Sequence, residues 1–212
     1  MKKTIIFAVM LLIPFLVNAE TVVKIGTMVT YGKVEELSFV FPSAELKLEQ
    51  SLYKGLGIGI GMRKETTWAY SGYYFSLYPT YKMKLSKNSF VAASLGVEYG
   101  LASSEYDRYI TTYDESGNLT AHKWIYLIQN APVPSKLKKG TIGVIHPFAT
   151  ISYGTRIWKR LFLETGFKVQ TLKFGVKSCK FEPTSGKAYD IRNDRKLIVA
   201  PSIFIQIGYR LF

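Results

Sequence analysis

The sequence is poor in the residues that build catalytic and metal centres. Its only cysteine, Cys179, excludes a disulfide within the chain, and cysteine pairs with zinc-binding spacing are absent. Its two histidines, His122 and His146, lie far apart in the sequence and form no cluster. No glycine-rich loop lies in a context that would cradle a phosphate. We therefore expect no cofactor, no metal ion and no enzymatic activity.

Long apolar runs are equally scarce, and the only one is at the amino terminus. Lys2 and Lys3 precede an apolar run from Ile5 to Val17, and Val17-Asn18-Ala19 has the small residues of a cleavage site. This pattern is typical of a secretory signal peptide. The run is shorter than the roughly 17–25 residues that a spanning helix needs. We predict that residues 1–19 are a signal peptide and that residues 20–212 form one domain.

Acidic residues are few relative to basic ones. The chain has 28 Lys and Arg against 15 Asp and Glu, which gives a formal net charge of +13. Such an excess can indicate a nucleic-acid partner, but export of the chain would separate it from nucleic acid, so we expect none. Lipid phosphates and other anionic groups of the cell surface remain as partners.

What the sequence has in plenty is alternation of apolar and polar residues. In its last stretch, Ile203, Ile205 and Ile207 alternate with Gln206 and Gly208, as in a strand whose two faces meet different surroundings. The same period of two recurs along the chain and predicts eight strands: Thr21–Tyr31, Ser38–Gln50, Leu56–Glu65, Tyr73–Leu85, Phe90–Leu101, His146–Ile157, Leu161–Phe174 and Leu197–Phe212.

The links between these strands alternate between tight and longer ones. Both long links, Asp107–Gly143 and Gly175–Arg195, are expected to be irregular, although His122–Gln129 is apolar enough for a further strand or a strand extension. Outer-membrane barrels have this asymmetry, with short periplasmic turns and longer extracellular loops. An even number of strands also returns the carboxyl terminus to the side where the amino terminus lies.

The two faces of the predicted strands differ in charge. We expect no charged residue on the apolar faces, whereas the polar faces are charged and rich in glycine, which suits a narrow lumen. We therefore predict an all-β fold, an eight-stranded antiparallel up-and-down transmembrane β-barrel. Tyrosine and tryptophan should mark its two membrane interfaces, Tyr31, Tyr73 and Tyr99 at one and Tyr53, Trp158 and Tyr209 at the other.

A barrel of eight strands is just wide enough for side chains to fill it, so the inward charges should pair across the lumen. The predicted ion-pair network consists of Glu45, Lys47, Arg63, Lys82, Glu98, Arg156, Glu164 and Lys168. A soluble, lipocalin-like carrier is the opposite solution, with the apolar faces inside, and it has the same period of two. Three prolines, Pro42, Pro79 and Pro201, lie inside predicted strands, where proline is normally confined to edges or bulges.

The chain resembles the small eight-stranded outer-membrane barrels of the OmpX and OmpA-transmembrane-domain kind over nearly all of its length after Ala19. Its last residues, Ile207-Gly208-Tyr209-Arg210-Leu211-Phe212, look like the terminal signal that the barrel-assembly machinery reads, with Tyr209, Leu211 and Phe212 as the signal residues. The resemblance implies the outer membrane of a Gram-negative bacterium. Phe212 departs from the pattern because it is out of phase with Tyr209, so either Leu211 takes its place or a bulge corrects the parity.

Function is less determined than fold. We expect a monomeric barrel with a structural or surface-interaction role. Its long links have more bases than acids, and they either bind lipopolysaccharide phosphates or a host or phage surface, or are simply solvated charged loops. The bases are Arg108, Lys123, Lys136, Lys138, Lys139, Lys177, Lys180, Lys187, Arg192 and Arg195. A lipid-A-modifying enzyme is the first alternative, and His122 with Asp114 and Ser116 is the set of residues that could serve it. A narrow, porin-like ion channel is the second alternative.

Overall fold

The computed structural model describes residues 20–67, 70–100, 105–129, 144–182, 185 and 187–211. The predicted signal peptide lies outside these residues. No helix long and apolar enough to cross a membrane occurs in these ranges. Their ten strands are β1 (Thr21–Val34), β2 (Leu37–Tyr53), β3 (Leu56–Thr67), β4 (Tyr70–Lys84), β5 (Ser89–Gly100), β6 (Glu105–Tyr113), β7 (Leu119–Gln129), β8 (Val144–Trp158), β9 (Leu161–Phe181) and β10 (Ala188–Arg210).

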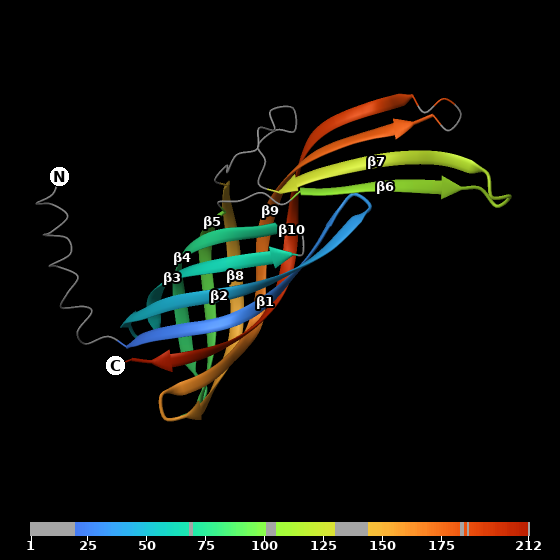
Figure 1. Ribbon diagram of the computed structural model, residues 1–212. Coiled ribbons are helices and arrows are strands. Elements are labelled where there is room, and N and C mark those ends of the chain that lie inside the picture. Colours follow the sequence, from blue (N-terminus) through green and yellow to red (C-terminus); the bar gives the residue numbers. More distant parts are fainter. Residues whose placement is uncertain are drawn as a thin grey trace, which may run out of the picture.

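Eight of these strands close into an antiparallel barrel (Figure 1). The order β1-β2-β3-β4-β5-β8-β9-β10 is completed by pairing of β10 with β1, from Val22 opposite Arg210 to Thr30 opposite Ser202. Closure leaves no unpaired strand edge within this part of the molecule, which a sheet in hydrocarbon requires. The predicted all-β, eight-stranded up-and-down barrel is confirmed.

The prediction of an irregular link over Asp107–Gly143 is wrong where the structure describes it. Strands β6 and β7 form a hairpin there, and β7 pairs with β9 from His122 opposite Phe181 to Gln129 opposite Phe174. The proposed strand His122–Gln129 is thus part of β7. The hairpin lies beyond the end of the barrel (Figure 1). Its neighbour in the sheet, β9, is far away in the sequence, so local periodicity does not indicate this pairing.

The prediction of an irregular second link, Gly175–Arg195, is also wrong. Strand β9 continues to Phe181 and β10 begins at Ala188, and the two remain paired, with a bulge between Tyr189 and Arg192. At about 3.3 Å per residue, the eight residues from Phe174 to Phe181 reach about 25 Å beyond the barrel. Together, β6, β7 and the outer parts of β9 and β10 form a sheet that projects from the barrel, called here the outer sheet.

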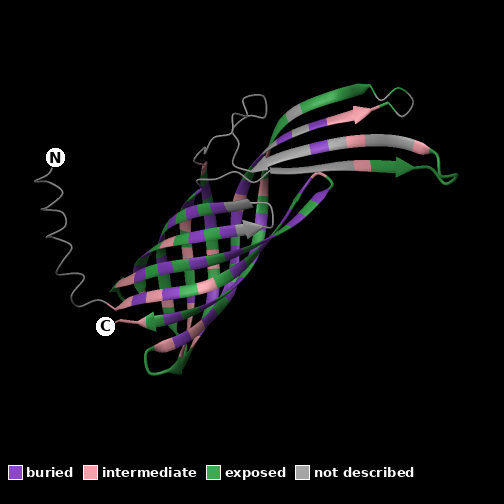
Figure 2. Cartoon of the chain, viewed as in Figure 1, coloured by how far each residue is buried: buried purple, intermediate pink, exposed green. Residues whose placement is uncertain are grey.

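The apolar faces point outward, as predicted for a membrane barrel and opposite to a lipocalin-like carrier. Figure 2 shows buried and exposed residues alternating along the barrel strands. On β10 the exterior residues Ile203, Ile205 and Ile207 are 60%, 50% and 48% exposed, while Phe204 between them is buried. All six aromatic residues expected at the interfaces are exposed: Tyr31, Tyr73, Tyr99, Tyr53, Trp158 and Tyr209.

The expectation that the apolar faces carry no charge is wrong at one end of the barrel. Lys64 follows Met62 on the exterior of β3, and Lys173 follows Val169 and Thr171 on the exterior of β9. Both lie at the margin toward the outer sheet, where an exterior residue leaves the apolar belt. A cation is tolerated there because a lysine side chain costs little near an interface.

The prolines lie where a strand ladder stops. Pro42, Pro79 and Pro201 are all on the barrel exterior. The β2–β3 ladder begins at Ser43, one residue after Pro42, and the β1–β10 ladder ends at Ser202, one residue after Pro201. The β4–β5 ladder is interrupted between Leu77 and Thr80, which brackets Pro79. Each proline is therefore unpaired toward one of its two neighbouring strands, and on that side its missing N–H costs no ladder hydrogen bond.

Candidate functional site

The lumen of the barrel contains balanced charge. Among the described residues, five bases and five acids are inside it: Lys24, Lys47, Arg63, Lys82 and Lys168, with Glu45, Glu49, Glu65, Glu98 and Glu164. They alternate with the exterior apolar residues along their strands, so the same period of two that builds the exterior builds the network. Burial of so many charges requires that each be paired.

The pairs cross the lumen between strands. Lys24 Nζ of β1 lies 2.7 Å from Glu49 Oε1 of β2 and 2.7 Å from Glu164 Oε2 of β9. Lys82 Nζ of β4 lies 2.7 Å from the other oxygen of Glu49. Tyr78 donates its hydroxyl proton to Glu49 over 3.1 Å. One cluster thus ties together β1, β2, β4 and β9.

A second cluster is centred on Glu98 of β5. Arg63 Nη2 lies 2.9 Å from Glu98 Oε2, and Arg63 Nη1 lies 3.1 Å from Glu65 Oε2. Lys168 forms an ion pair with the other oxygen of Glu98. The Arg63 guanidinium also lies 3.9 Å from the centre of the Tyr74 ring. Each of these charged side chains is at most 2% exposed, so the cluster is shielded from solvent.

Aromatic rings fill the space that the charges leave. Lys168 Nζ lies 4.4 Å from the centre of the Phe148 ring, and Lys47 Nζ lies 5.0 Å from that of Phe204. The cavity among Tyr78, Phe148, Phe204 and their neighbours measures about 10 Å³. This is about the space that one water molecule needs. The lumen is therefore closely packed around these side chains.

The outer end of the lumen is closed by apolar side chains. Val34, Leu37, Phe39 and Phe41 of the β1–β2 hairpin pack against residues of β7, β9 and β10, which are Ile125, Leu172, Phe174, Val176 and Ala200. The rings of Phe39 and Phe174 lie 5.2 Å apart. This apolar plug joins the outer sheet to the barrel and separates the charged lumen from the outside.

Comparison with known proteins gives the fold. No family model and no curated protein matches the sequence. The solved structure of Neisserial surface protein A shares 7% sequence identity, covers 90% of this chain and 97% of its own, and has a TM-score of 0.53. The N-terminal β-barrel domain of Pseudomonas aeruginosa OprF shares 8%, with 92% and 100% coverage and a TM-score of 0.49. A major outer membrane protein of Thermus thermophilus shares 15%, with 92% and 100% coverage and a TM-score of 0.47. The chain has the fold of a small outer-membrane barrel.

Seven of the eight residues predicted for the lumen network of this outer-membrane barrel lie in the lumen. Arg156 does not, because its side chain is exposed at the end of the barrel opposite the outer sheet. Lys24, Glu49 and Glu65 belong to the two clusters but were not in the predicted network. Each of the three is in phase with the inward residues of its own strand, and this signal could have added them to the predicted network.

The residues considered for catalysis are engaged in structure where they are described. Asp114 Oδ1 accepts hydrogen bonds from the backbone N–H groups of Ser116 (2.9 Å) and Asn118 (2.8 Å) in the β6–β7 turn. These bonds lower the pKa of Asp114, with the Asn118 bond contributing most. His146 is fully buried in the lumen beside Tyr74. His122 lies on β7 opposite Thr111. The described residues contain no group of acids, histidines and cysteines suited to a metal ion.

The predicted terminal signal is only partly described, since Phe212 lies outside the described residues. Tyr209 is exposed on the exterior of β10. The β1–β10 pairing runs without a bulge to Arg210, and the backbone N–H of Leu211 donates to the carbonyl of Thr21 over 2.8 Å. No bulge corrects the parity before residue 211, so Leu211 has the same parity as Tyr209.

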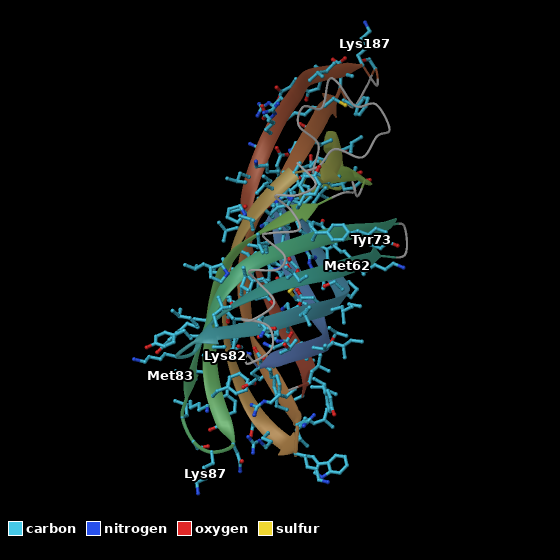
Figure 3. The ribbon with its side chains drawn as sticks, turned by 90° about the vertical axis from the view of Figure 1, so that its left-hand side faces the viewer. Met62, Tyr73, Lys82, Met83, Lys87 and Lys187 are labelled. Atoms are coloured by element: carbon cyan, nitrogen blue, oxygen red, sulfur yellow. The ribbon has the colours of Figure 1, made fainter. Side chains whose placement is uncertain are left out.

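On four strands, exposed cations follow the apolar belt toward the outer sheet, and this set is called here the collar. Exterior residues that follow the apolar belt are Lys33 on β1, Lys64 on β3, Lys173 on β9 and Arg195 on β10, and all four are exposed. Lys64 Nζ lies 5.9 Å from the ring of Tyr73, which belongs to the aromatic residues of the same interface. Figure 3 shows Tyr73 at the outer part of the barrel. No Asp or Glu lies on the described exterior faces of these four strands within the barrel.

The predicted basic residues of the outer sheet are more neutralised than those of the collar. Lys123 Nζ lies 3.3 Å from Glu35 Oε2 and 3.4 Å from Glu36 Oε1. Lys180 and Arg192 both pair with Asp190, at 3.3 and 3.0 Å. These residues line a cleft of about 300 Å³ between the β1–β2 turn and the outer sheet. Lys136, Lys138 and Lys139 lie outside the described residues.

Proposed function

We propose that this chain is an integral protein of the bacterial outer membrane with a structural and surface-interaction role. It is exported by its signal peptide, inserted by the barrel-assembly machinery through its last strand, and works as a monomer that holds the outer sheet above the membrane. The observation that carries the proposal is the combination of an apolar exterior with a lumen of paired charges under an apolar plug.

The collar supports lipopolysaccharide as the lipid partner. Lys64 of the collar lies 5.9 Å from the ring of the interfacial Tyr73, and Lys33 follows the interfacial Tyr31 on the exterior of β1, at the level where lipid phosphates meet an outer-membrane barrel. Each lysine or arginine near an anionic membrane surface contributes roughly 1 kcal/mol of attraction at physiological salt. Four such residues therefore supply on the order of 4 kcal/mol, enough to prefer an anionic leaflet over a neutral one.

The outer sheet supports an interaction at the cell surface. Strand β6 is paired only with β7 among the described residues, so its other edge is open. The part of β10 before Ser202 is likewise unpaired on the side toward β1. Open edges can pair with a strand of another protein. The packed lumen, in contrast, gives no support to an ion-conducting role.

The proposal is tested by fractionation and by lipid binding. The expressed protein should fractionate with outer membranes and migrate faster on gels before boiling than after. Lys33→Gln/Lys64→Gln/Lys173→Gln should weaken association of the folded barrel with lipopolysaccharide, and Lys33→Arg/Lys64→Arg/Lys173→Arg should keep it. Association that is insensitive to salt and to the glutamine variant would refute the electrostatic role of the collar, and recovery in the soluble periplasmic fraction would refute the membrane placement.

A further inference from the structure

The end of the barrel opposite the outer sheet opens into a basic cavity. Its volume is about 600 Å³, within the range of small-ligand sites. It lies between the β4–β5 link, the β8–β9 turn and the end of β10. Six cations line it, with no Asp or Glu among the lining residues: Lys84, Lys87, Arg156, Lys159, Arg160 and Arg210. Figure 3 shows Lys87 at the tip farthest from Lys187 of the outer sheet.

The floor of this cavity is aromatic. The rings of Phe90 and Phe162 lie 5.4 Å apart in an edge-to-face arrangement. Glycines make room for them, because a Cβ atom at Gly154 would lie 2.1 Å from Cζ of Phe90, and one at Gly208 would lie 2.1 Å from Cζ of Phe162. The floor is thus built into the strands and separates the cavity from the lumen.

The carboxylates of the lumen are not available to pair with the cations of the cavity. Those nearest the floor, Glu49 and Glu164, are bonded to Lys24 and Lys82, whose amino groups lie 5.9 and 5.8 Å from the floor rings. The negative charge of the lumen is therefore already matched by lumen cations, and the rings lie between these pairs and the cavity.

The cavity cations themselves have one carboxylate between them in the described part of the chain. Arg210 Nε lies 2.8 Å from Glu20 Oε1. Arg160 Nη1 donates to the carbonyl of Leu211 over 2.9 Å, and Lys159 lies over the Trp158 ring. Lys84, Lys87 and Arg156 have no ion pair with a described residue. Among the described side chains, six positive charges against one negative charge leave an excess of five positive charges around this cavity.

We propose that this cavity binds a phosphate group. Converging like charges repel one another, and a bound anion relieves that repulsion. Three of the six cations are arginines, whose guanidinium groups match phosphate oxygens in a two-pronged geometry. In the membrane orientation proposed above, the cavity faces the periplasm and the inner leaflet. The phosphate then belongs either to the headgroup of an anionic phospholipid or to a soluble phosphate compound.

Binding of inorganic pyrophosphate to the folded barrel in a nonionic detergent tests the site without depending on membrane orientation. Calorimetry should detect binding that weakens with salt. A unit charge pair at 4 Å in water is worth about 1 kcal/mol, or about fivefold in affinity. Lys84→Gln/Arg156→Gln should therefore weaken binding about 25-fold, and Lys84→Arg/Arg156→Lys should keep it within a few-fold. Lys187→Gln/Lys196→Gln removes the same charge from the outer sheet and should change affinity less than about twofold.

A second arm separates the two sources of phosphate. In nanodiscs of phosphatidylcholine, pyrophosphate should bind as it does in detergent. If the natural ligand is an anionic headgroup, phosphatidylglycerol in the nanodiscs should reduce pyrophosphate binding, and only for proteins that retain Lys84 and Arg156; undiminished binding assigns the site to a soluble phosphate compound. No pyrophosphate binding in detergent, or equal loss in the cavity and outer-sheet variants, would overturn the proposal. A heat-shifted band on gels confirms that each variant is folded, so loss of binding is distinct from loss of the barrel.

Discussion

The Glu98 cluster makes the sharpest prediction about what stabilises the barrel. Glu98 is 1% exposed and is bonded to two cations, Arg63 and Lys168. Glu98→Gln leaves Arg63 with Glu65 at 3.1 Å, but Lys168 loses its only ion-paired carboxylate among the described residues. Removing one partner of a buried pair costs about 3–5 kcal/mol because the other charge stays buried and uncompensated. We expect Glu98→Gln to lower the free energy of unfolding by about that amount.

Equilibrium unfolding in urea, followed by far-UV circular dichroism of the barrel in liposomes, measures this change. Glu36→Gln is the matched control, because Glu36 has a 54% exposed side chain and lies 3.4 Å from Lys123. An exposed pair is worth about 0–1 kcal/mol, so the control should unfold almost as the unmodified protein does.

A second substitution separates charge burial from simple loss of packing. Adding Lys168→Met to Glu98→Gln removes the uncompensated cation, and we expect it to recover a large part of the lost stability. If Glu98→Gln costs no more than Glu36→Gln, or if Lys168→Met adds a further loss instead of a recovery, the lumen charges are not held as a dry, paired network and the reasoning is refuted.

Three further predictions concern the exterior, the cavity floor and the outer sheet. Ile203→Lys, at mid-depth on the exterior of β10, should cost about 2–4 kcal/mol in liposome unfolding, whereas Thr171→Lys near the collar should cost about 0–1 kcal/mol. Gly154→Ala should cost about 1–3 kcal/mol in the same assay because its Cβ would overlap the Phe90 ring, and an unchanged stability would show that the ring moves freely. Hydrogen bonds from Arg192 and Lys180 lower the pKa of Asp190, so the stabilisation they give is complete above the ordinary aspartate pKa of about 4 and is lost as the pH falls through the lower, folded value. Amide chemical shifts of the β9–β10 hairpin should therefore change in acid, and Asp190→Asn should abolish that change.

The barrel was predictable from sequence because its pattern is local. On β10, the alternation of Ile203, Ile205 and Ile207 with Phe204 and Gln206 reflects two surroundings that differ along the whole strand, lipid on one side and lumen on the other. Every one of the eight predicted barrel strands is present, six of them with bounds within three residues of the prediction, whereas β9 ends seven residues later and β10 begins nine residues earlier. Period two decides the face of each residue, and the face decides which residues can enter the lumen.

The outer sheet was not predictable in this way because its two faces are less distinct. Beyond Lys173, Phe174 and Val176 pack into the apolar plug, but the residues of opposite parity on β9 are no longer apolar as they are on the barrel exterior: Gly175, Lys177 and Cys179. Its polar residues resemble those of a loop, so Gly175–Arg195 lost the contrast that marks a strand. The pairing of β7 with β9 joins segments about 50 residues apart, and nothing local indicates that register.

The identity of each ion pair was also beyond the sequence. Parity places Lys24, Glu49 and Glu164 inside, but their contact depends on closure of the barrel through β10, between residues up to 140 positions apart. Arg156 has the same inward parity, yet it lies one step too close to the end of β8 and is exposed in the cavity mouth. Depth along the strand, which periodicity does not give, separates a lumen residue from a mouth residue.

Depth also determines where the net charge acts. The five bases and five acids of the described lumen cancel, so the excess of 28 basic over 15 acidic residues lies outside it. The described exterior of the barrel has no charge between the collar and the cavity, because hydrocarbon excludes it. The charges of the described barrel exterior are therefore found toward its two ends, in the collar and around the basic cavity. Ions in solution screen exposed charges far more than buried pairs. Salt should therefore weaken the anion binding that we propose for the two ends more than it weakens the ion pairs of the lumen.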